Sequence, residues 1–291
     1  MEVGIMIAAT AETGDIAAIA REVENLGFES FFIPEHPVIP VDFKTPVPGG
    51  GELPEHYGRW MDPIVPLSMA AAVTRRVKLG TGICLLPERE PIITAKAIAT
   101  LDVVSGGRVV LGVGGGWLRE ETEALGTRFG LRWKRLRETV EAMRKLWTEA
   151  EPSYQGELVS FPPVRCEPKP LQKPSPPILL GARGPQAHAR VVATYDGWAP
   201  VAGPPAALKT DIAALRQLAR ERGRHPADLP VTAFVAPGDD GISLEDLKLY
   251  RDAGANRLVL FSQRDAIRMA NGRALEVVRR VAPTVERAQH L

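Results

Sequence analysis

The chain has little cysteine, no long apolar run and no basic leader. Cys84 and Cys166 are its two cysteines in 291 residues, and no C-x-x-C spacing joins them. This argues against a disulfide framework or a zinc site and suits a reducing cytoplasm. No apolar run approaches membrane-spanning length. Residues 1–9 lack the basic start of a signal peptide and are typical of a first strand. We therefore expect a cytoplasmic protein with no metal and no membrane partner.

Charge of one sign is also lacking. Lys and Arg number 36 and Asp and Glu 35, so the net charge is +1. No basic stripe interleaved with aromatic residues is present, which argues against nucleic acid as a partner. Hydrophobic residues make up 45% and charged residues 24%, which is typical of a globular chain with a large core. The length fits two domains or one α/β barrel.

Short apolar segments alternate with amphipathic ones along the whole chain. The expected strands are 3–8, 30–33, 77–85, 108–113, 178–180, 197–200, 231–235 and 257–261. The expected helices are 15–26, 62–74, 91–104, 133–147, 185–194, 205–222, 243–253 and 273–287. Eight such units with right-handed crossovers predict an α/β fold, a (β/α)8 TIM barrel, as one domain over 1–291. A doubly wound open sheet is the alternative. Loops 37–60 and 150–177 are expected to fold over the C-terminal mouth.

Glycine gathers at two neighbouring strand ends. Gly114, Gly115 and Gly116 follow the fourth strand, and the turn 181–184 follows the fifth. Without Cβ atoms, backbone N–H groups can approach an anion closely at a helix start. A Rossmann fingerprint would need Gly or Ala where Trp117 stands. Close packing alone is the other explanation. The two turns, with Arg183 beside the second, favour a phosphate site.

A histidine follows the second strand, where a barrel carries its functional residues. His36 has a carboxylate, Glu35, beside it in sequence and prolines on both sides of the pair. An imidazole that titrates near neutrality can exchange a proton with a substrate. Glu35 either orients His36 or points away, since adjacent strand residues face opposite sides. Glu120 and Glu121 are interpreted as first-turn helix residues favoured by the dipole. The other four histidines are placed on loops or helix surfaces.

Several motifs occur in order and resemble those of the bacterial luciferase-like monooxygenase superfamily, in particular its coenzyme F420-dependent branch. They are Asp62-Pro63, Lys78-Leu-Gly-Thr-Gly-Ile83, the run from Leu101 to Trp117, Tyr154-Gln-Gly156, Phe161 and Pro176-Pro-Ile-Leu-Leu-Gly181. The resemblance implies a flavin or deazaflavin across the barrel mouth. It implies a cis peptide at Gly82-Ile83 under the ring. It also implies phosphate contacts from Gly115, Gly116 and the Gly181, Ala182, Arg183, Gly184 turn, and a catalytic pair at Glu35 and His36.

The resemblance implies an oxidoreductase in which F420 exchanges a hydride with a small organic substrate. Trp117 stands where sugar-phosphate dehydrogenases of the branch carry an acid, so it predicts an aromatic wall rather than sugar-phosphate oxidation. Tyr57 and Trp60 are candidates for lining the substrate pocket. Family members usually dimerise, which implies a homodimer.

Three other functions remain open. The first is an FMN-dependent monooxygenase supplied with reduced flavin by a separate reductase. The second is a non-catalytic flavin-binding protein. The third is a phosphosugar isomerase or aldolase on the same fold, although no strand-end Lys nucleophile is evident.

Overall fold

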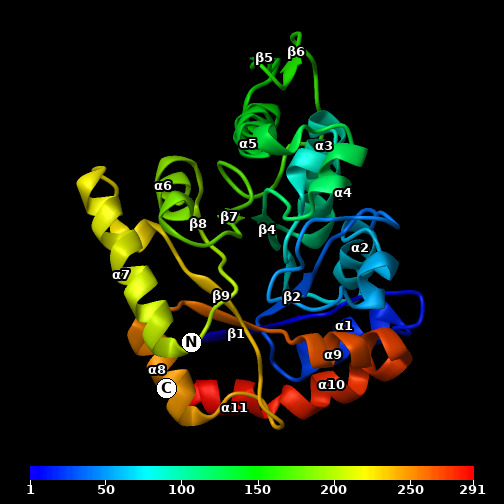
Figure 1. The fold of residues 1–291 in the computed structure, drawn as a ribbon, viewed down its shortest axis with the longest axis vertical. Coiled ribbons are helices and arrows are strands. Elements are labelled where there is room, and N and C mark those ends of the chain that lie inside the picture. The colour runs from blue at the N-terminus through cyan, green and yellow to red at the C-terminus, as the bar shows by residue number, and fades with distance from the viewer.

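The computed structural model describes residues 1–291, and its centre is one sheet of eight parallel strands (Figure 1). The strand order is β8-β7-β4-β3-β2-β1-β10-β9. The strands are β1 (Glu2–Met6), β2 (Ser30–Ile33), β3 (Lys78–Thr81), β4 (Val109–Val113), β7 (Ile178–Leu180), β8 (Gly197–Trp198), β9 (Thr232–Val235) and β10 (Arg257–Leu260). They are short, apolar and buried, as expected for a sheet covered by helices.

The sheet closes on itself. Isolated parallel bridges, Trp198 to Val231 and Val201 to Phe234, join the β8 and β9 edges. The prediction of a (β/α)8 barrel is therefore confirmed, and the open doubly wound sheet is not formed.

Helices surround the barrel (Figure 1). They are α1 (Ile16–Asn25), α2 (Ile64–Val73), α3 (Pro91–Ser105), α4 (Arg119–Ala124), α5 (Arg132–Thr148), α6 (Pro185–Thr194), α7 (Pro205–Glu221), α8 (Leu244–Ala253), α9 (Gln263–Arg268), α10 (Ala274–Val281) and α11 (Pro283–Gln289). Asp15 caps α1 by accepting from two backbone amides, as its sequence position predicts. The predicted last helix is two helices. The helix start expected at Glu120 and Glu121 is the short α4, and α9 was not predicted. None of these helices is long and apolar enough to cross a membrane.

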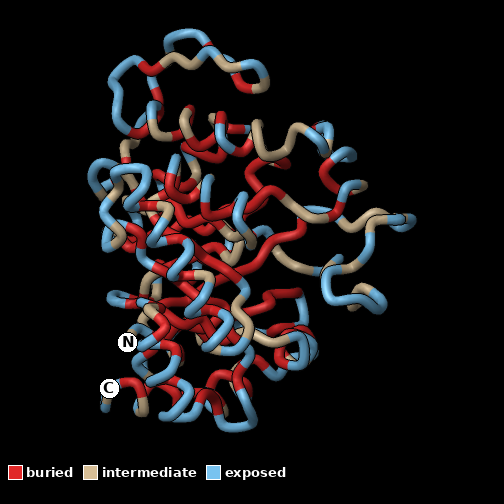
Figure 2. Tube along the Cα trace, turned by 60° about the vertical axis from the view of Figure 1, so that its left-hand side comes forward, coloured by how far each residue is buried: buried red, intermediate tan, exposed pale blue.

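The core has two layers, and Figure 2 shows the buried residues running through the centre of the molecule. The larger layer lies between strands and helices. The smaller fills the barrel with Met6, Phe32, Val110, Leu179, Ala199, Phe234 and Val259. Gly80 makes room for the ring of Phe32, because a Cβ there would lie 2.3 Å from that ring. The barrel is thus plugged from within and leaves only its mouth for ligands.

The two long excursions have different places. Residues 47–60 lie at the mouth, as predicted. The excursion 150–177 does not, because it forms the hairpin of β5 (Tyr154–Gln155) and β6 (Ser160–Phe161) beyond α5 (Figure 1). Glu138 of α5 holds it by accepting from the amides of Leu158 at 2.7 Å and Val159 at 3.1 Å. The expectation that 150–177 covers the mouth is wrong.

Candidate active site

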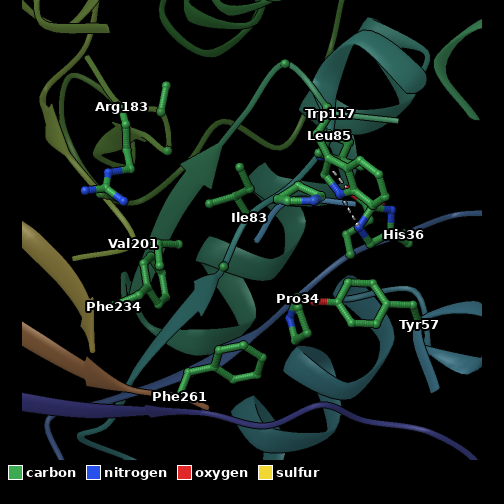
Figure 3. Close-up of a pocket in the computed structure, with 18 of the residues that line it drawn as sticks. Pro34, His36, Tyr57, Ile83, Leu85, Trp117, Arg183, Val201, Phe234 and Phe261 are labelled. Carbon is green, nitrogen blue, oxygen red and sulfur yellow. Dashed lines mark hydrogen bonds between the residues drawn. The ribbon is translucent and has the colours of Figure 1, made fainter. Parts of the chain in front are cut away.

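A cavity of about 1210 Å³ opens at the carboxyl ends of the strands. All the site residues expected from sequence line it except Gly114. They are Glu35, His36, Tyr57, Trp60, Gly82, Ile83, Gly115, Gly116, Trp117, Gly181, Ala182, Arg183 and Gly184. Figure 3 shows His36, Trp117 and Tyr57 grouped at one end and Arg183 at the other, with Ile83 between them in this view.

His36 lies at one end, just beyond β2, surrounded by aromatic rings. The ring centroids of Tyr57, Trp60 and Trp117 lie 5.4, 5.5 and 5.8 Å from its own. The indole Nε1 of Trp117 donates to His36 Nε2 at 3.3 Å (Figure 3). The other ring nitrogen, Nδ1, lies 2.7 Å from Oε2 of Glu121. Because an indole only donates, Nε2 accepts, and Nδ1–H donates to Glu121.

Glu121 is the functional-site residue that the sequence interpretation missed. Its side chain is 0% exposed, although it lies in the first turn of the short helix α4. A signal was present in the sequence. Glu121 and Thr122 follow the buried Leu118 by three and four positions, so they share its inward face.

Glu35 points away from His36. Its carboxylate accepts from the amide of Leu85 at 2.6 Å and from Nε of Arg89 at 2.6 Å. Arg89 also pairs with Asp62. Of the two orientations considered for Glu35, the structure has the one in which Glu35 points away and does not orient His36. Glu35 instead holds the segment after β3 against β2.

A third carboxyl, Glu88, is buried near Glu121. Burial, and then the neighbouring charge of Glu121, raise the pKa of Glu88 to about 8. Its Oε1 accepts from Thr122 Oγ1 at 2.8 Å, and Oε2 has no partner. Glu88 is therefore mostly neutral at pH 7.

Ile83 forms the floor between the two ends. The peptide bond from Gly82 to Ile83 is cis, as the resemblance implied. Gly114 and Gly181 flank the side chain of Ile83, and a Cβ on them would lie 2.0 Å and 2.8 Å from its atoms. Gly114 therefore shapes the cavity through Ile83 without lining it.

The remaining glycines differ in what surrounds them. A Cβ on Gly115 would lie 3.1 Å from the ring of Trp133, and one on Gly116 would lie 2.8 Å from Glu88 Oε1. Close packing against neighbouring side chains therefore explains why Gly115 and Gly116 follow β4. Gly184, with φ +85°, has nothing within 4 Å of that position, so its backbone is open to the cavity.

Three arginines line the cavity, Arg132, Arg183 and Arg190, and Figure 3 shows Arg183 at the end opposite His36. Arg132 donates to the carbonyl oxygens of Gly116 and Phe129, and Arg190 donates to the side-chain oxygen Oε1 of Gln186. No carboxylate pairs with any of the three arginines. Burial, and then Arg190 and Arg119, lower the pKa of Arg132. This end is an uncompensated cationic site. The sequence interpretation found only Arg183.

Both aromatic residues proposed for the substrate pocket come from the loop over the mouth. Tyr57 contacts Gln263 of α9 through its hydroxyl, which links this loop to the region after β10. His188 lies on α6 and is buried, so its expected place on a helix surface is wrong. His56 lies in the loop over the mouth, as expected, and is also buried. Burial lowers the pKa of each. No group of three or more His, Cys, Asp or Glu is placed to hold a metal ion.

The family model for luciferase-like monooxygenases matches residues 1–241. The chain belongs to this family. The protein Rv0953c of Mycobacterium tuberculosis is 46% identical over 186 residues, which are 62% of this chain and 66% of that protein. The chain therefore spans just under two thirds of that relative. The oxygenase component of the flavin-dependent trigonelline monooxygenase of Acinetobacter baylyi is 35% identical over 44% of this chain and 36% of its own length.

A solved structure shows the same fold. An F420-dependent secondary alcohol dehydrogenase superimposes with a TM-score of 0.74, covering 94% of this chain and 97% of its own, at 17% identity. At this identity the likeness shows the fold alone. This luciferase-like family is one of oxidoreductases and monooxygenases, and its neighbours use either F420 or a flavin.

Proposed function

We propose that this protein is an oxidoreductase that binds F420 across the barrel mouth and exchanges a hydride with a small organic substrate. The observation that carries the proposal is the uncompensated cluster of Arg132, Arg183 and Arg190. Arg132 and Arg190 are half-buried and Arg183 is exposed, and three cations without carboxylates favour a ligand with more than one negative charge. F420 has a polyanionic tail, whereas FMN has one phosphate group.

The cavity's own shape and residues fit such a cofactor. Its tail would bind at the arginine end, beside the open backbone of Gly184 and the start of α6. Its ring would lie over the floor made by Gly82 and Ile83. The remaining proposed contacts are Gly115, Gly116, Trp117, Gly181 and Ala182, and Gly114 would act on the ring only through Ile83. When bound, F420 supplies a centre that accepts or donates a hydride.

The chain's residues supply proton exchange and a dry pocket. His36 Nε2 faces Trp117 at the cavity wall and would exchange a proton with the substrate. Tyr57, Trp60 and Trp117 would bound the substrate and exclude water. We further propose that residues 1–291 act as one domain. A homodimer is also proposed, and the exposed Val65 and Met69 on α2 support it.

The second candidate is an FMN-dependent monooxygenase that receives reduced flavin from a reductase partner. The likeness to the trigonelline monooxygenase component favours it. Reduced FMN forms an oxygen adduct, whereas a deazaflavin does not. One phosphate among the three arginines would leave part of their charge uncompensated.

Equilibrium titration of the purified protein with four compounds tests the proposal. They are F420, the same deazaflavin without its phosphate and glutamate tail, FMN and riboflavin. We expect F420 to bind about tenfold or more tightly than FMN, and loss of the tail to cost about 100-fold, since charged hydrogen bonds contribute about 1.5–3 kcal/mol each. Arg190→Gln should weaken F420 binding, whereas Arg128→Gln, outside the cavity, should not. Tighter FMN binding would favour the monooxygenase, and binding of neither would overturn the cationic-site argument.

A further inference from the structure

We propose that Glu121 is a positioning residue that fixes the tautomer of His36 and balances the charge His36 gains when it takes a proton from substrate. The proton transfer from substrate rests on the proposed function, whereas the contact between Glu121 and His36 does not. Glu121 lies 85 residues from His36 in sequence, and only the short helix α4 brings the two together.

The hydrogen bonds fix which nitrogen carries the proton. Trp117 can only donate, so its Nε1 at 3.3 Å needs a lone pair on His36 Nε2. A carboxylate can only accept, so Glu121 Oε2 at 2.7 Å needs a hydrogen on Nδ1. Both contacts favour the Nδ1–H tautomer. That tautomer leaves the basic nitrogen at the wall of the cavity.

Glu121 and Glu35, the two carboxylates near His36, differ in whether a cation pairs with them. Glu35 is permanently compensated by Arg89. Glu121 is fully buried and has no Lys or Arg partner, and its second oxygen has only the amide of Val38 at 3.4 Å. A buried carboxylate without a cation is costly, and an imidazolium is the one cation within its reach.

The other titratable groups facing this pair do not compete for that role. Glu88 of the segment before α3 is mostly neutral at pH 7, because burial and Glu121 raise its pKa to about 8. Tyr57 of the mouth loop is also neutral, because burial raises the pKa of its hydroxyl. When His36 takes up a proton, its imidazolium therefore balances the carboxylate of Glu121, and the net charge of the pair is zero.

The step balances for a hydroxyl compound. The hydroxyl oxygen would give its proton to His36 Nε2, and bound F420 would supply the centre that takes the hydride from the carbinol carbon. A carbonyl compound and an imidazolium paired with Glu121 result, and the reverse step reduces the carbonyl. The long 3.3 Å contact from Trp117 gives way to the substrate hydroxyl. Since Tyr57, Trp60 and Trp117 surround His36 and no Lys or Arg pairs with it, the substrate class is an uncharged alcohol or its carbonyl counterpart.

Nitrogen-15 NMR of the cofactor-free protein tests the positioning directly. The neutral His36 ring should carry its hydrogen on Nδ1 in the wild type. In Glu121→Leu, which lacks the acceptor, a large fraction should move to Nε2. Glu123→Gln, on the exposed face of the same helix, should leave His36 unchanged. A wild-type ring protonated on Nε2 would overturn the proposal, even if the leucine variant fails to fold.

Kinetics with bound F420 test the charge. We use Glu121→Gln, which keeps an acceptor and loses the charge, with 2-propanol and cyclohexanol as probes. kcat should fall about 100-fold, the scale of general-base catalysis, while KM stays within about threefold. Glu123→Gln should match the wild type. An unchanged kcat in Glu121→Gln would overturn the role of Glu121 and leave the proposed function standing. Failure of F420 to bind would overturn the function, and the NMR result would still decide the positioning.

Discussion

Three carboxyl groups lie buried at the His36 end, and each is stabilised differently. Glu35 pairs with Arg89, Glu121 contacts His36, and Glu88 stays protonated. A low-dielectric site tolerates a charge only when it is paired, so a third nearby carboxylate is forced to be neutral. Substitutions of the three should therefore have different consequences.

Glu88→Gln should make the protein more stable at alkaline pH. The folded pKa of Glu88, about 8, lies above its ordinary value of 4.5. Its contribution to stability is thus fully present below about pH 4.5 and is lost as pH rises through 8. A neutral amide avoids that loss. We expect a gain on the order of 2–4 kcal/mol at pH 9 by urea unfolding. Glu123→Gln should show no such gain, and parallel pH profiles for Glu88→Gln and wild type would contradict the prediction.

Gly116→Ala should destabilise the fold by steric contact as well as by backbone strain. Its φ is +73°, and the new Cβ would lie 2.8 Å from Glu88 Oε1 and 3.2 Å from Thr122 Oγ1. Gly126 has a similar φ of +87° and open space around it. Strain alone costs about 1 kcal/mol, so Gly116→Ala should exceed Gly126→Ala by at least about 1 kcal/mol in the free energy of unfolding. Equal losses would show that Glu88 and Thr122 move aside freely.

At the scale of elements, Glu120 makes most of the hydrogen bonds that join the loop over the mouth to α4. Glu120 accepts from the amides of Lys44 and Thr45 at 2.8 and 3.3 Å, and from Thr45 Oγ1 at 2.7 Å. These bonds, the one from Lys44 first, lower the pKa of Glu120 to about 2. The tie is complete above about pH 4.5 and is lost as pH falls through 2.

Glu120→Ala should therefore loosen the loop and leave the barrel intact. Amides of residues 38–54 should exchange hydrogen about tenfold faster or more, because loss of the tie favours local opening. Amides in β1 and β10 should exchange as in the wild type. Exchange by mass spectrometry at pH 7 measures both regions at once. Unchanged rates in the loop would mean that its other contacts, among them Tyr57 with Gln263 and Val38 with Glu121, hold it without Glu120.

Sequence patterns located the elements that carry the site better than the contacts between them. The ends of β2, β3, β4 and β7 were predicted within a few residues, because short buried strands and glycine turns are local signals. Glu121 was assigned to the helix dipole, because α4 has only one and a half turns and its partner lies on another strand. Arg132 and Arg190 were missed for the same reason, since each lies on a helix that reaches the mouth only in the closed barrel.

At the scale of the whole molecule, the barrel has one weak seam. β1 and β10 pair over four residues, whereas β8 and β9 meet through two isolated bridges. We expect the seam amides of Ala202 and Phe234 to exchange hydrogen faster than amides of β10, since fewer cooperative bonds protect them. Residue-resolved NMR exchange measures this. Slower exchange at the seam would show that the interior side chains, not the ladder, hold the barrel closed there.

The barrel as a whole followed from the alternation of strands and helices, but the path of its long loops did not. The excursion 150–177 contains many prolines and no periodic signal, so nothing local directs it to the mouth or away from it. Glu138 decides the matter by binding the hairpin from α5. The contact depends on burial of the Glu138 carboxylate. Periodicity alone predicts that a glutamate of α5 lies on the solvated face of the helix.

The link between Tyr57 and Gln263 predicts an order in which ligands enter. It joins the mouth loop to α9 at the His36 end of the cavity and leaves the arginine end without such a link. A ligand that spans both ends passes this link only while the loop is open. A small molecule can reach His36 afterwards. Turnover should therefore follow an ordered sequence, with the large ligand first to arrive and last to leave.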